Sequence, residues 1–295
     1  MRLVTFDDYR IGVLGDDGVR DVSSVVPGWE PGDLWGMNRL ITRWDTLQSR
    51  VQEAAASGAA KPLDSVHLLA PIPTPIHLFA APANYRAHVA EMQQQGFRGT
   101  AGGGGGENTA DTLGFFVKCT GSISGPQDPI ALPQRDWPER RFDHEGEIAF
   151  VISRPAKGVS PEDAISYIFG YTIVVDVTLR AGNGRNEERV QRKSYASFSP
   201  MGPCVTTADE IGDWRQLQVK LWLNGEQKQD ARATDMIVDI PNLLSRASHV
   251  LPMSPGDVYT TGSPPGVGRV APGDTVVVES PGIGRMSLDV IERDW

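Results

Sequence analysis

Residues 142–152 read FDHEGEIAFVI, an acidic cluster that leads directly into an apolar strand. Glu145 and Glu147 are two residues apart, so in a strand their carboxylates leave the same face, opposite the apolar side chains. Asp176 lies within a second apolar run, IVVDV at residues 173–177, where an unpaired carboxylate is costly. Three carboxylates beside apolar strands favour a shared cation. Ligation by oxygen alone favours Mg²⁺, Mn²⁺ or Ca²⁺ over Zn²⁺.

A solvated Glu-x-Glu face and an Asp at a bulge or sheet edge are the structural alternatives. The segment between the two strands favours the shared site. Ser160-Pro161-Glu162-Asp163 has an N-cap serine, a proline at N1 and an acidic N3 residue, which predicts a short helix ending at Gly170. A strand–helix–strand connection of this kind can bring the two acidic strands side by side.

The composition is that of an ordinary soluble globular protein, with 295 residues, 40% hydrophobic and 22% charged. A formal charge of −9 argues against nucleic acid or an anionic membrane as the partner. The N-terminus has no apolar signal core, and no apolar run approaches the length of a membrane span. The cysteines, Cys119 and Cys204, suggest buried thiols and no disulfide framework, which is typical of a reducing cytoplasm.

Two domains are expected, a small strand and helix domain over residues 1–70 and a larger catalytic domain over residues 71–295. Asp16-Asp17-Gly18 predicts a hairpin, and residues 34–56 have the apolar spacing of one helix. A proline-rich connection, residues 71–75, marks the boundary. Beyond it, strands separated by Pro-Gly-Asp and Asn-Gly turns predict an α+β fold that is mainly β.

Five consecutive glycines, residues 102–106, stand apart from this pattern. The segment cannot bury apolar surface, so a mobile surface loop is one interpretation. The hinge of a lid is the other, because the segment follows the region of His88.

The sequence resembles the fumarylacetoacetate hydrolase family along residues 72–292. The acidic run at 142–152 is followed by IFGYT at 168–172 and VDV at 175–177. Further segments match in collinear order: NYRAH at 84–88, GPQDPI at 125–130, KSY at 193–195, PMGPCVT at 200–206, LNGE at 223–226, PGDV at 255–258 and TGSPPGVG at 261–268. The resemblance implies the family's mixed β-sandwich roll and assembly as a homodimer.

His88 and Glu91 lie on the same side of a predicted helical turn. A carboxylate at this spacing can orient an imidazole and raise its basicity, as a general base requires. An exposed pair on an amphipathic turn is the alternative from the residues alone. The resemblance implies that the two form a water-activating dyad. His144 alternates with the proposed ligands along the strand, so it should point away from them.

The resemblance also implies roles for residues around the metal. Lys193 would stabilise negative charge that develops on the cleaved substrate. The expected substrate contacts are Tyr85, Arg180, Asn183, Gly262 and Ser263. The chain departs from the family pattern at Val175, Ala181, Asn183 and Ala196, which leaves the identity of the substrate open.

The implied function is that of a divalent-metal-dependent hydrolase. It would cleave a C–C bond in a 1,3-dicarbonyl or acylpyruvate-type 2-oxo acid through a metal-bound enolate, with Mg²⁺ or Mn²⁺ expected and Ca²⁺ possible. Isomerase, decarboxylase and hydratase or lyase activities use the same enolate chemistry and are alternatives. A non-catalytic relative that kept the fold as a binding module is a third alternative.

Overall fold

The computed structural model describes residues 1–94, 108–133, 139–182 and 186–293. The glycine run at 102–106 and Asn183 lie outside the described residues. No helix in those ranges is long and apolar enough to span a bilayer.

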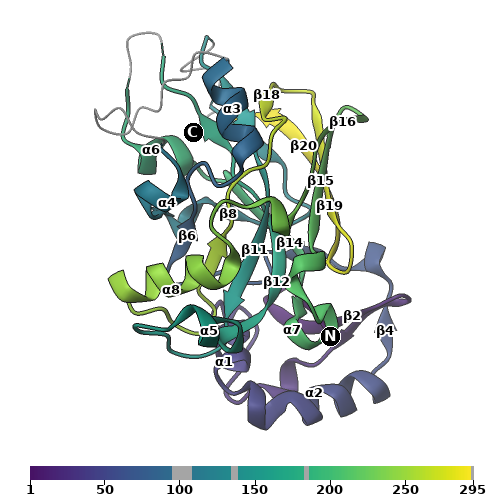
Figure 1. Ribbon diagram of the computed structural model, residues 1–295. Helices are drawn as coiled ribbons and strands as arrows, with labels where there is room; N and C mark the ends of the chain where they lie inside the picture. The colour runs from purple at the N-terminus through teal and green to yellow at the C-terminus, as the bar shows by residue number, and fades with distance from the viewer. Residues whose placement is uncertain (95–107, 134–138, 183–185, 294–295) are drawn as a thin grey trace.

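The largest sheet of the described chain has 12 strands and passes through the centre of the molecule (Figure 1). Its order is β4 (Ala60–Lys61), β3 (Gly18–Asp21), β2 (Arg10–Gly15), β1 (Arg2–Phe6), β14 (Ser199–Thr207), β12 (Ile168–Val175), β11 (Gly146–Ile152), β17 (Val258–Thr260), β6 (Leu78–Ala80) and β7 (Phe116–Lys118). Off this path, β5 (Leu68–Leu69) pairs with β1 and β8 (Ile123–Ser124) pairs with β14.

Two smaller sheets accompany it. One has five strands, in the order β16 (Glu226–Arg232), β15 (Gln218–Leu223), β19 (Thr275–Ser280), β20 (Gly284–Glu292) and β9 (Ile130–Leu132). The other has three, in the order β13 (Thr178–Leu179), β10 (Phe142–His144) and β18 (Gly268–Val270). The five-stranded sheet lies beside the central strands β11, β12 and β14 (Figure 1).

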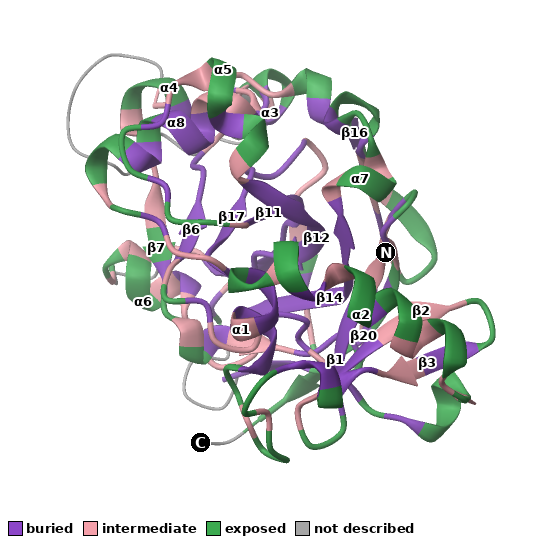
Figure 2. Cartoon of the chain, turned by 90° about the horizontal axis from the view of Figure 1, so that it is seen from below, coloured by how far each residue is buried: buried purple, intermediate pink, exposed green. Residues whose placement is uncertain are grey.

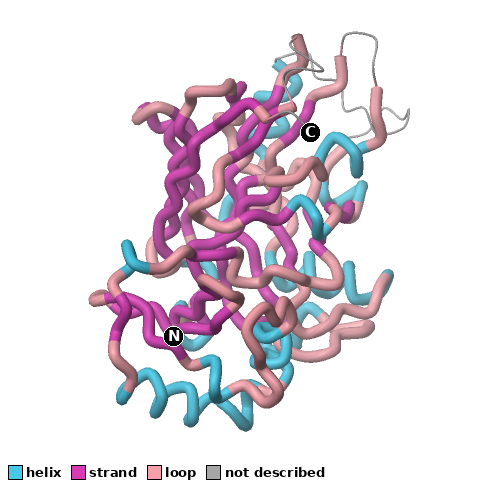
Figure 3. Tube along the Cα trace, turned by 180° about the vertical axis from the view of Figure 1, so that it is seen from behind, coloured by secondary structure: helices cyan, strands magenta, loops and turns pink. Residues whose placement is uncertain are grey.

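In the view from behind, helices lie mainly at the bottom and along the right-hand side of the molecule (Figure 3). The α-helices are α1 (Gly36–Thr42), α2 (Trp44–Ser57), α3 (Arg86–Gln94), α4 (Ala110–Leu113), α5 (Pro161–Ala164), α6 (Arg189–Lys193), α7 (Ala208–Ile211) and α8 (Ile240–Val250). The 3₁₀ turns are η1 (Ser23–Val25), η2 (Leu63–Ser65), η3 (Thr120–Ser122), η4 (Ile165–Tyr167), η5 (Trp214–Gln216) and η6 (Ala233–Asp235).

The central strands are buried on both faces (Figure 2). In β11, Ile148 and Phe150 pack into the core cluster that includes the five-stranded sheet, while Ala149 and Val151 pack into the cluster formed with α1 and α2. Both faces of the strand therefore exclude water. A Cβ atom at Gly146 would lie 2.9 Å from the side chain of Leu221 in β15, so a larger residue there would require Leu221 to shift.

The prediction of an α+β fold that is mainly β is confirmed, and the hairpin at Asp16–Gly18 forms between β2 and β3. Three local expectations were wrong. Residues 34–56 form two helices, α1 and α2, with a break at Arg43. The helix that begins at Pro161 ends at Ala164 and not at Gly170, which lies inside β12. Cys119 is exposed, although Cys204 is buried.

The N-terminal strands join the main sheet, since β1 pairs antiparallel with β14. The division into domains at residues 70 and 71 stays a prediction.

Candidate metal centre and active site

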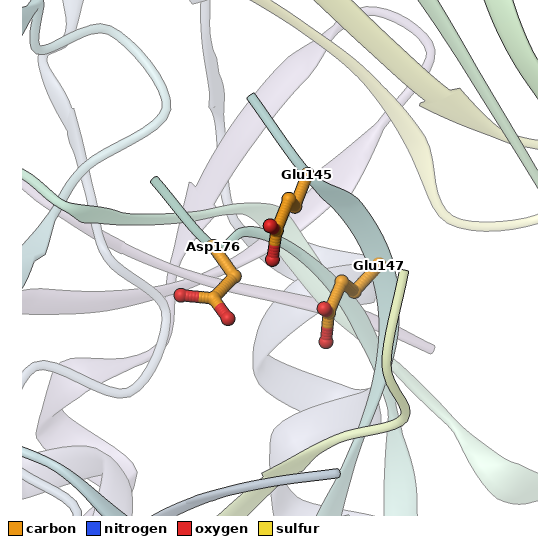
Figure 4. Close-up of side chains that lie close together, drawn as sticks. All are labelled: Glu145, Glu147 and Asp176. Atoms are coloured by element: carbon orange, nitrogen blue, oxygen red, sulfur yellow. The ribbon is translucent and has the colours of Figure 1, made fainter. Parts of the chain in front are cut away.

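Glu145, Glu147 and Asp176 converge in the middle of the molecule (Figure 4). Glu147 lies in β11, Glu145 directly precedes this strand, and Asp176 directly follows β12. The strands are antiparallel neighbours with Gly146 opposite Val175, and the Asp176 backbone N–H donates to the Glu145 carbonyl oxygen at 2.7 Å. One carboxylate oxygen from each residue lies within 4.8 Å of the other two. The acidic strands are therefore side by side, as the sequence predicted.

The three carboxylates are almost completely buried, with exposed fractions of 5%, 1% and 1%. The Nζ of Lys193 on α6 donates to Glu145 at 2.7 Å and to Asp176 at 2.6 Å. Glu147 accepts the backbone N–H of Gly262 at 2.9 Å. Lys193 therefore donates hydrogen bonds to two of the three carboxylates.

The two glutamates differ in charge state. Burial raises the pKa of Glu145, but the charges of Lys193 and Arg180 outweigh this effect and hold the pKa well below its usual range. Burial, together with the neighbouring charges of Asp176 and Glu145, raises the pKa of Glu147 well above its usual range. Burial and the repulsion of its neighbours thus disfavour the charged form of Glu147, and the ligand atoms of the cluster are all oxygen. This donor set suits a hard divalent cation.

Lys118 is a buried residue beside the carboxylate cluster that the sequence analysis missed. It is the last residue of β7, and its buried Nζ donates to Oδ1 of Asp176 at 2.5 Å and to the Phe198 carbonyl oxygen at 2.7 Å. Burial lowers the pKa of Lys118, and the charge of Asp176 opposes the effect. Its sequence signal is a lysine directly after the apolar run at 115–117, the same kind of signal that identified Asp176.

Arg180 follows β13 and closes one side of the cluster. Its Nε donates to Asp143 at 2.7 Å and its guanidinium donates to Oε1 of Glu145 at 2.6 Å. Asp143 is fully buried and also accepts from Arg141 at 2.6 Å. Arg180 therefore orients a metal-ligand candidate directly, in addition to the substrate contact predicted for it.

His88 and Glu91 lie on α3, with Nδ1 of His88 3.4 Å from Oε2 of Glu91. The same Glu91 oxygen accepts the Gly266 backbone N–H at 3.0 Å, which ties α3 to the segment between β17 and β18. His88 is buried, and this burial lowers its pKa despite the opposing charges of Glu145 and Glu91. A neutral imidazole thus lies near the carboxylate cluster.

The other predicted substrate contacts lie around Glu147. Tyr85 is buried, and burial together with the charge of Glu147 raises its pKa. Gly262 has φ +92°, and a Cβ atom there would lie 2.8 Å from Asn84. The hydroxyl of Ser263 accepts from Gln229 at 3.0 Å, and the Gln229 side chain also accepts the Gly146 N–H at 2.9 Å. Gln229 thus links Ser263 to the strand that carries the glutamates, a link that the sequence did not reveal.

His144 pairs across the small sheet with Gly268, and it is not among the residues whose ligand atoms converge. Among the predicted site residues, only Asn183 lies outside the described chain. The roles assigned to the others stay predictions.

Comparisons with known proteins agree with this geometry. The family model described as Fumarylacetoacetate (FAA) hydrolase C-terminal matches residues 77–291. Maleylpyruvate hydrolase of Aquipseudomonas alcaligenes is 35% identical over 293 residues, which cover 98% of this chain and 99% of that protein.

Solved structures give the same result. A maleylpyruvate hydrolase from Sphingobium sp. SYK-6, in complex with manganese(II) ion and pyruvate, has a TM-score of 0.85 at 35% identity, with 100% of both chains covered. A probable 2-hydroxyhepta-2,4-diene-1,7-dioate isomerase from Mycobacterium abscessus has a TM-score of 0.79 at 26% identity, covering 100% of this chain and 99% of that one. The buried acidic triad and these matches support a divalent metal. The chain belongs to the fumarylacetoacetate hydrolase family, as a metal-dependent hydrolase or isomerase.

Proposed function

We propose that the chain is a hydrolase that cleaves a C–C bond in a 1,3-dicarbonyl or acylpyruvate-type 2-oxo acid. The observation that carries this proposal is the buried triad Glu145, Glu147 and Asp176, with Lys193 and His88 beside it. The related hydrolase whose structure contains manganese(II) and pyruvate supports a 2-oxo acid as the ligand class. Mg²⁺ or Mn²⁺ is the proposed cation, held by the three carboxylates.

A divalent cation in this position supplies Lewis-acid polarisation of a bound carbonyl group. Lys193 lies within hydrogen-bonding distance of two of the carboxylates, and its proposed role is to stabilise negative charge on the leaving group. Gly262 and Ser263 are the proposed contacts for a substrate carboxylate, and the Gly262 N–H, which donates to Glu147, sets this segment beside the triad.

His88 supplies the base. Its lowered pKa keeps the imidazole neutral near neutral pH. With Nδ1–H donating to Glu91, the lone pair of Nε2 is free to take a proton from water. Water activated in this way attacks the acyl carbon, and the C–C bond then breaks.

Isomerisation is the second candidate, because a structural neighbour at 26% identity is a probable isomerase. It requires enolisation and reprotonation but no activated water. The role of His88 therefore separates the two candidates.

Calorimetry tests the metal site first. Mn²⁺ titrated into metal-stripped protein should bind, and pyruvate should then bind only to the Mn²⁺-loaded form. Glu147→Gln should abolish Mn²⁺ binding because it removes a ligand charge, and Glu162→Gln, an exposed residue of α5, is the matched control. Unchanged Mn²⁺ affinity in Glu147→Gln would contradict the proposal.

His88→Gln tests the reaction type. It should lower maleylpyruvate hydrolysis by roughly 10²- to 10⁴-fold, the usual contribution of a general base. Metal-dependent deuterium exchange into the pyruvate methyl group should persist, because enolisation does not need the activated water. Full hydrolysis in this variant would exclude His88 as the base. Isomerase activity with no hydrolysis in the wild type would favour the second candidate.

We also propose that the enzyme is a cytoplasmic homodimer with a small-molecule oxo acid as its substrate, and that residues 1–70 and 71–295 are its domains. Light scattering of the full chain tests the dimer.

A further inference from the structure

Gln229 is a buried polar residue on an edge strand. Strand β16 forms the edge of the five-stranded sheet (Figure 1), and Gln229 is only 1% exposed. Lys228 is an extra residue in the pairing with β15, because Leu221 pairs with Gln229 and the next residue, Trp222, pairs with Gln227. This bulge turns Gln229 toward the interior, although Gln227, two residues earlier, is exposed.

The side-chain amide of Gln229 joins two parts of the site. Its Oε1 accepts the N–H of Gly146, the residue between the two glutamates of the triad, at 2.9 Å. Its Nε2 donates to the Pro264 carbonyl oxygen at 2.9 Å and to the Ser263 hydroxyl at 3.0 Å. A backbone N–H can only donate and a carbonyl oxygen can only accept, so these partners admit one orientation of the amide.

This orientation determines the polarity of the Ser263 hydroxyl. The oxygen accepts from Gln229, so its own O–H is left to act as a donor. The contact of this O–H with the Pro264 carbonyl oxygen, at 3.3 Å, is long for an O–H···O bond. The same carbonyl oxygen already accepts from Gln229. The Ser263 proton is therefore able to turn to a stronger acceptor, and an ionised carboxylate is one.

The segment that carries Ser263 packs closely against the bulge. A Cβ atom at Gly266, where φ is +91°, would collide with the carbonyl oxygen of Lys228. Gly262 of the same segment donates its N–H to Glu147 at 2.9 Å. The segment is thus held between β16 and the strand of the triad, and the Ser263 hydroxyl is fixed relative to both.

We propose that Gln229 is a positioning residue, which fixes the Ser263 hydroxyl as a donor and so makes this end of the site selective for a substrate carboxylate. This inference rests on the proposed function and assigns the residue that gives Ser263 its polarity. Gln229 acts through Ser263 and does not itself contact the substrate. A hydroxyl that is already oriented loses less conformational freedom when it binds a carboxylate than one that rotates freely.

A double-mutant cycle on pyruvate affinity tests this role, by calorimetry on the Mn²⁺-loaded full-length enzyme. Ser263→Ala should weaken pyruvate binding roughly tenfold, the usual contribution of a hydrogen bond to a charged group. Gln229→Met should weaken it by roughly threefold to tenfold, because the hydroxyl is no longer oriented. In the Ser263→Ala background, Gln229→Met should cause no further loss.

Gln227→Met is the matched control, because Gln227 lies on the same strand but is exposed and donates to Asp230. It should leave pyruvate affinity unchanged. Gln229→Asn is a second variant, for use if methionine prevents folding. It shortens the side chain by one methylene, which withdraws the amide from Ser263 but keeps a polar group at the buried position, and it should give the same cycle.

Three outcomes would contradict these expectations. A loss in Gln229→Met that is equally large in the Ser263→Ala background would show that Gln229 acts through Gly146, and it would overturn this inference alone. Wild-type pyruvate affinity in Ser263→Ala would also overturn this inference alone. Failure of the Mn²⁺-loaded wild type to bind pyruvate would overturn the proposed function and this inference with it.

Discussion

Lys118 holds one carboxylate oxygen of Asp176, a candidate metal ligand, through a single hydrogen bond. Oδ1 of Asp176 is occupied by Lys118, while Oδ2 accepts from Lys193. The Phe198 carbonyl oxygen fixes the Lys118 ammonium from the other side. Each carboxylate oxygen of Asp176 therefore accepts from a different lysine, and Lys118 fixes the position of Oδ1.

Lys118→Met should destabilise the metal-stripped protein by roughly 3–5 kcal/mol, the usual cost of removing one partner of a buried ion pair. Urea unfolding measures the loss. Lys61→Met is the control, because Lys61 is only half-buried and lies over the Phe6 ring, and it forms no ion pair with any residue that the structure describes. It should change the unfolding free energy by about 0.5 kcal/mol or less. Equal losses in the two variants would contradict the role of Lys118.

At the scale of elements, helix α3 is positioned by Glu91, which accepts the N–H of Gly266 and faces His88 with the same oxygen. This arrangement has a consequence for pH dependence. In the proposed mechanism neutral His88 is the active form, so the rate should fall as the pH drops through its pKa, which burial places below the usual histidine range. Glu91 raises that pKa through its hydrogen bond and its charge.

Glu91→Gln should therefore move the acidic limb of the kcat/KM profile to lower pH. The plateau should also fall, by roughly tenfold or more, because a less basic and less well oriented imidazole is a poorer base. Profiles of the Mn²⁺-loaded enzyme measure both effects, with Glu162→Gln as the control. A limb that stays in place or moves to higher pH would show that Glu91 does not act on His88.

The strand period of two was enough to predict from the sequence that Glu145 and Glu147 share a face. Contacts between distant strands could not be predicted in this way. Gly170 looked like the end of a helix, yet it lies in β12, where a Cβ atom would collide with the carbonyl oxygen of Thr206 in β14. A glycine is needed at position 170 because two strands approach closely there, and the local sequence does not reveal that approach. Lys118 does follow an apolar run, but its partner Asp176 lies 58 residues away, and nothing in the sequence pairs the two.

At the scale of the whole molecule, the site depends on charged groups enclosed by sheets that are buried on both faces. The same enclosure keeps His144 neutral. The residue is fully buried opposite Gly268, and burial lowers the pKa of His144 to about 4, although the charges of Asp143 and Glu145 oppose the shift and Lys228 adds to it. The unfolded chain protonates this histidine near pH 6.5.

Acid should therefore destabilise the fold through His144. Between pH 6.5 and about 4 the unfolded state binds a proton that the folded state does not, so the unfolding free energy falls as the pH falls through this window. The loss attributable to His144 is on the order of 3 kcal/mol. Urea unfolding in EDTA at pH 7.5 and pH 4.5 (about half a unit above the lower end of the window) should show a smaller acid loss in His144→Gln than in the wild type. His67→Gln, at an exposed position, should behave like the wild type. If His144→Gln loses as much stability in acid as the wild type does, the acid sensitivity arises from the carboxylates of the site, because the charges that hold the pKa of Glu145 low also make its protonation destabilising.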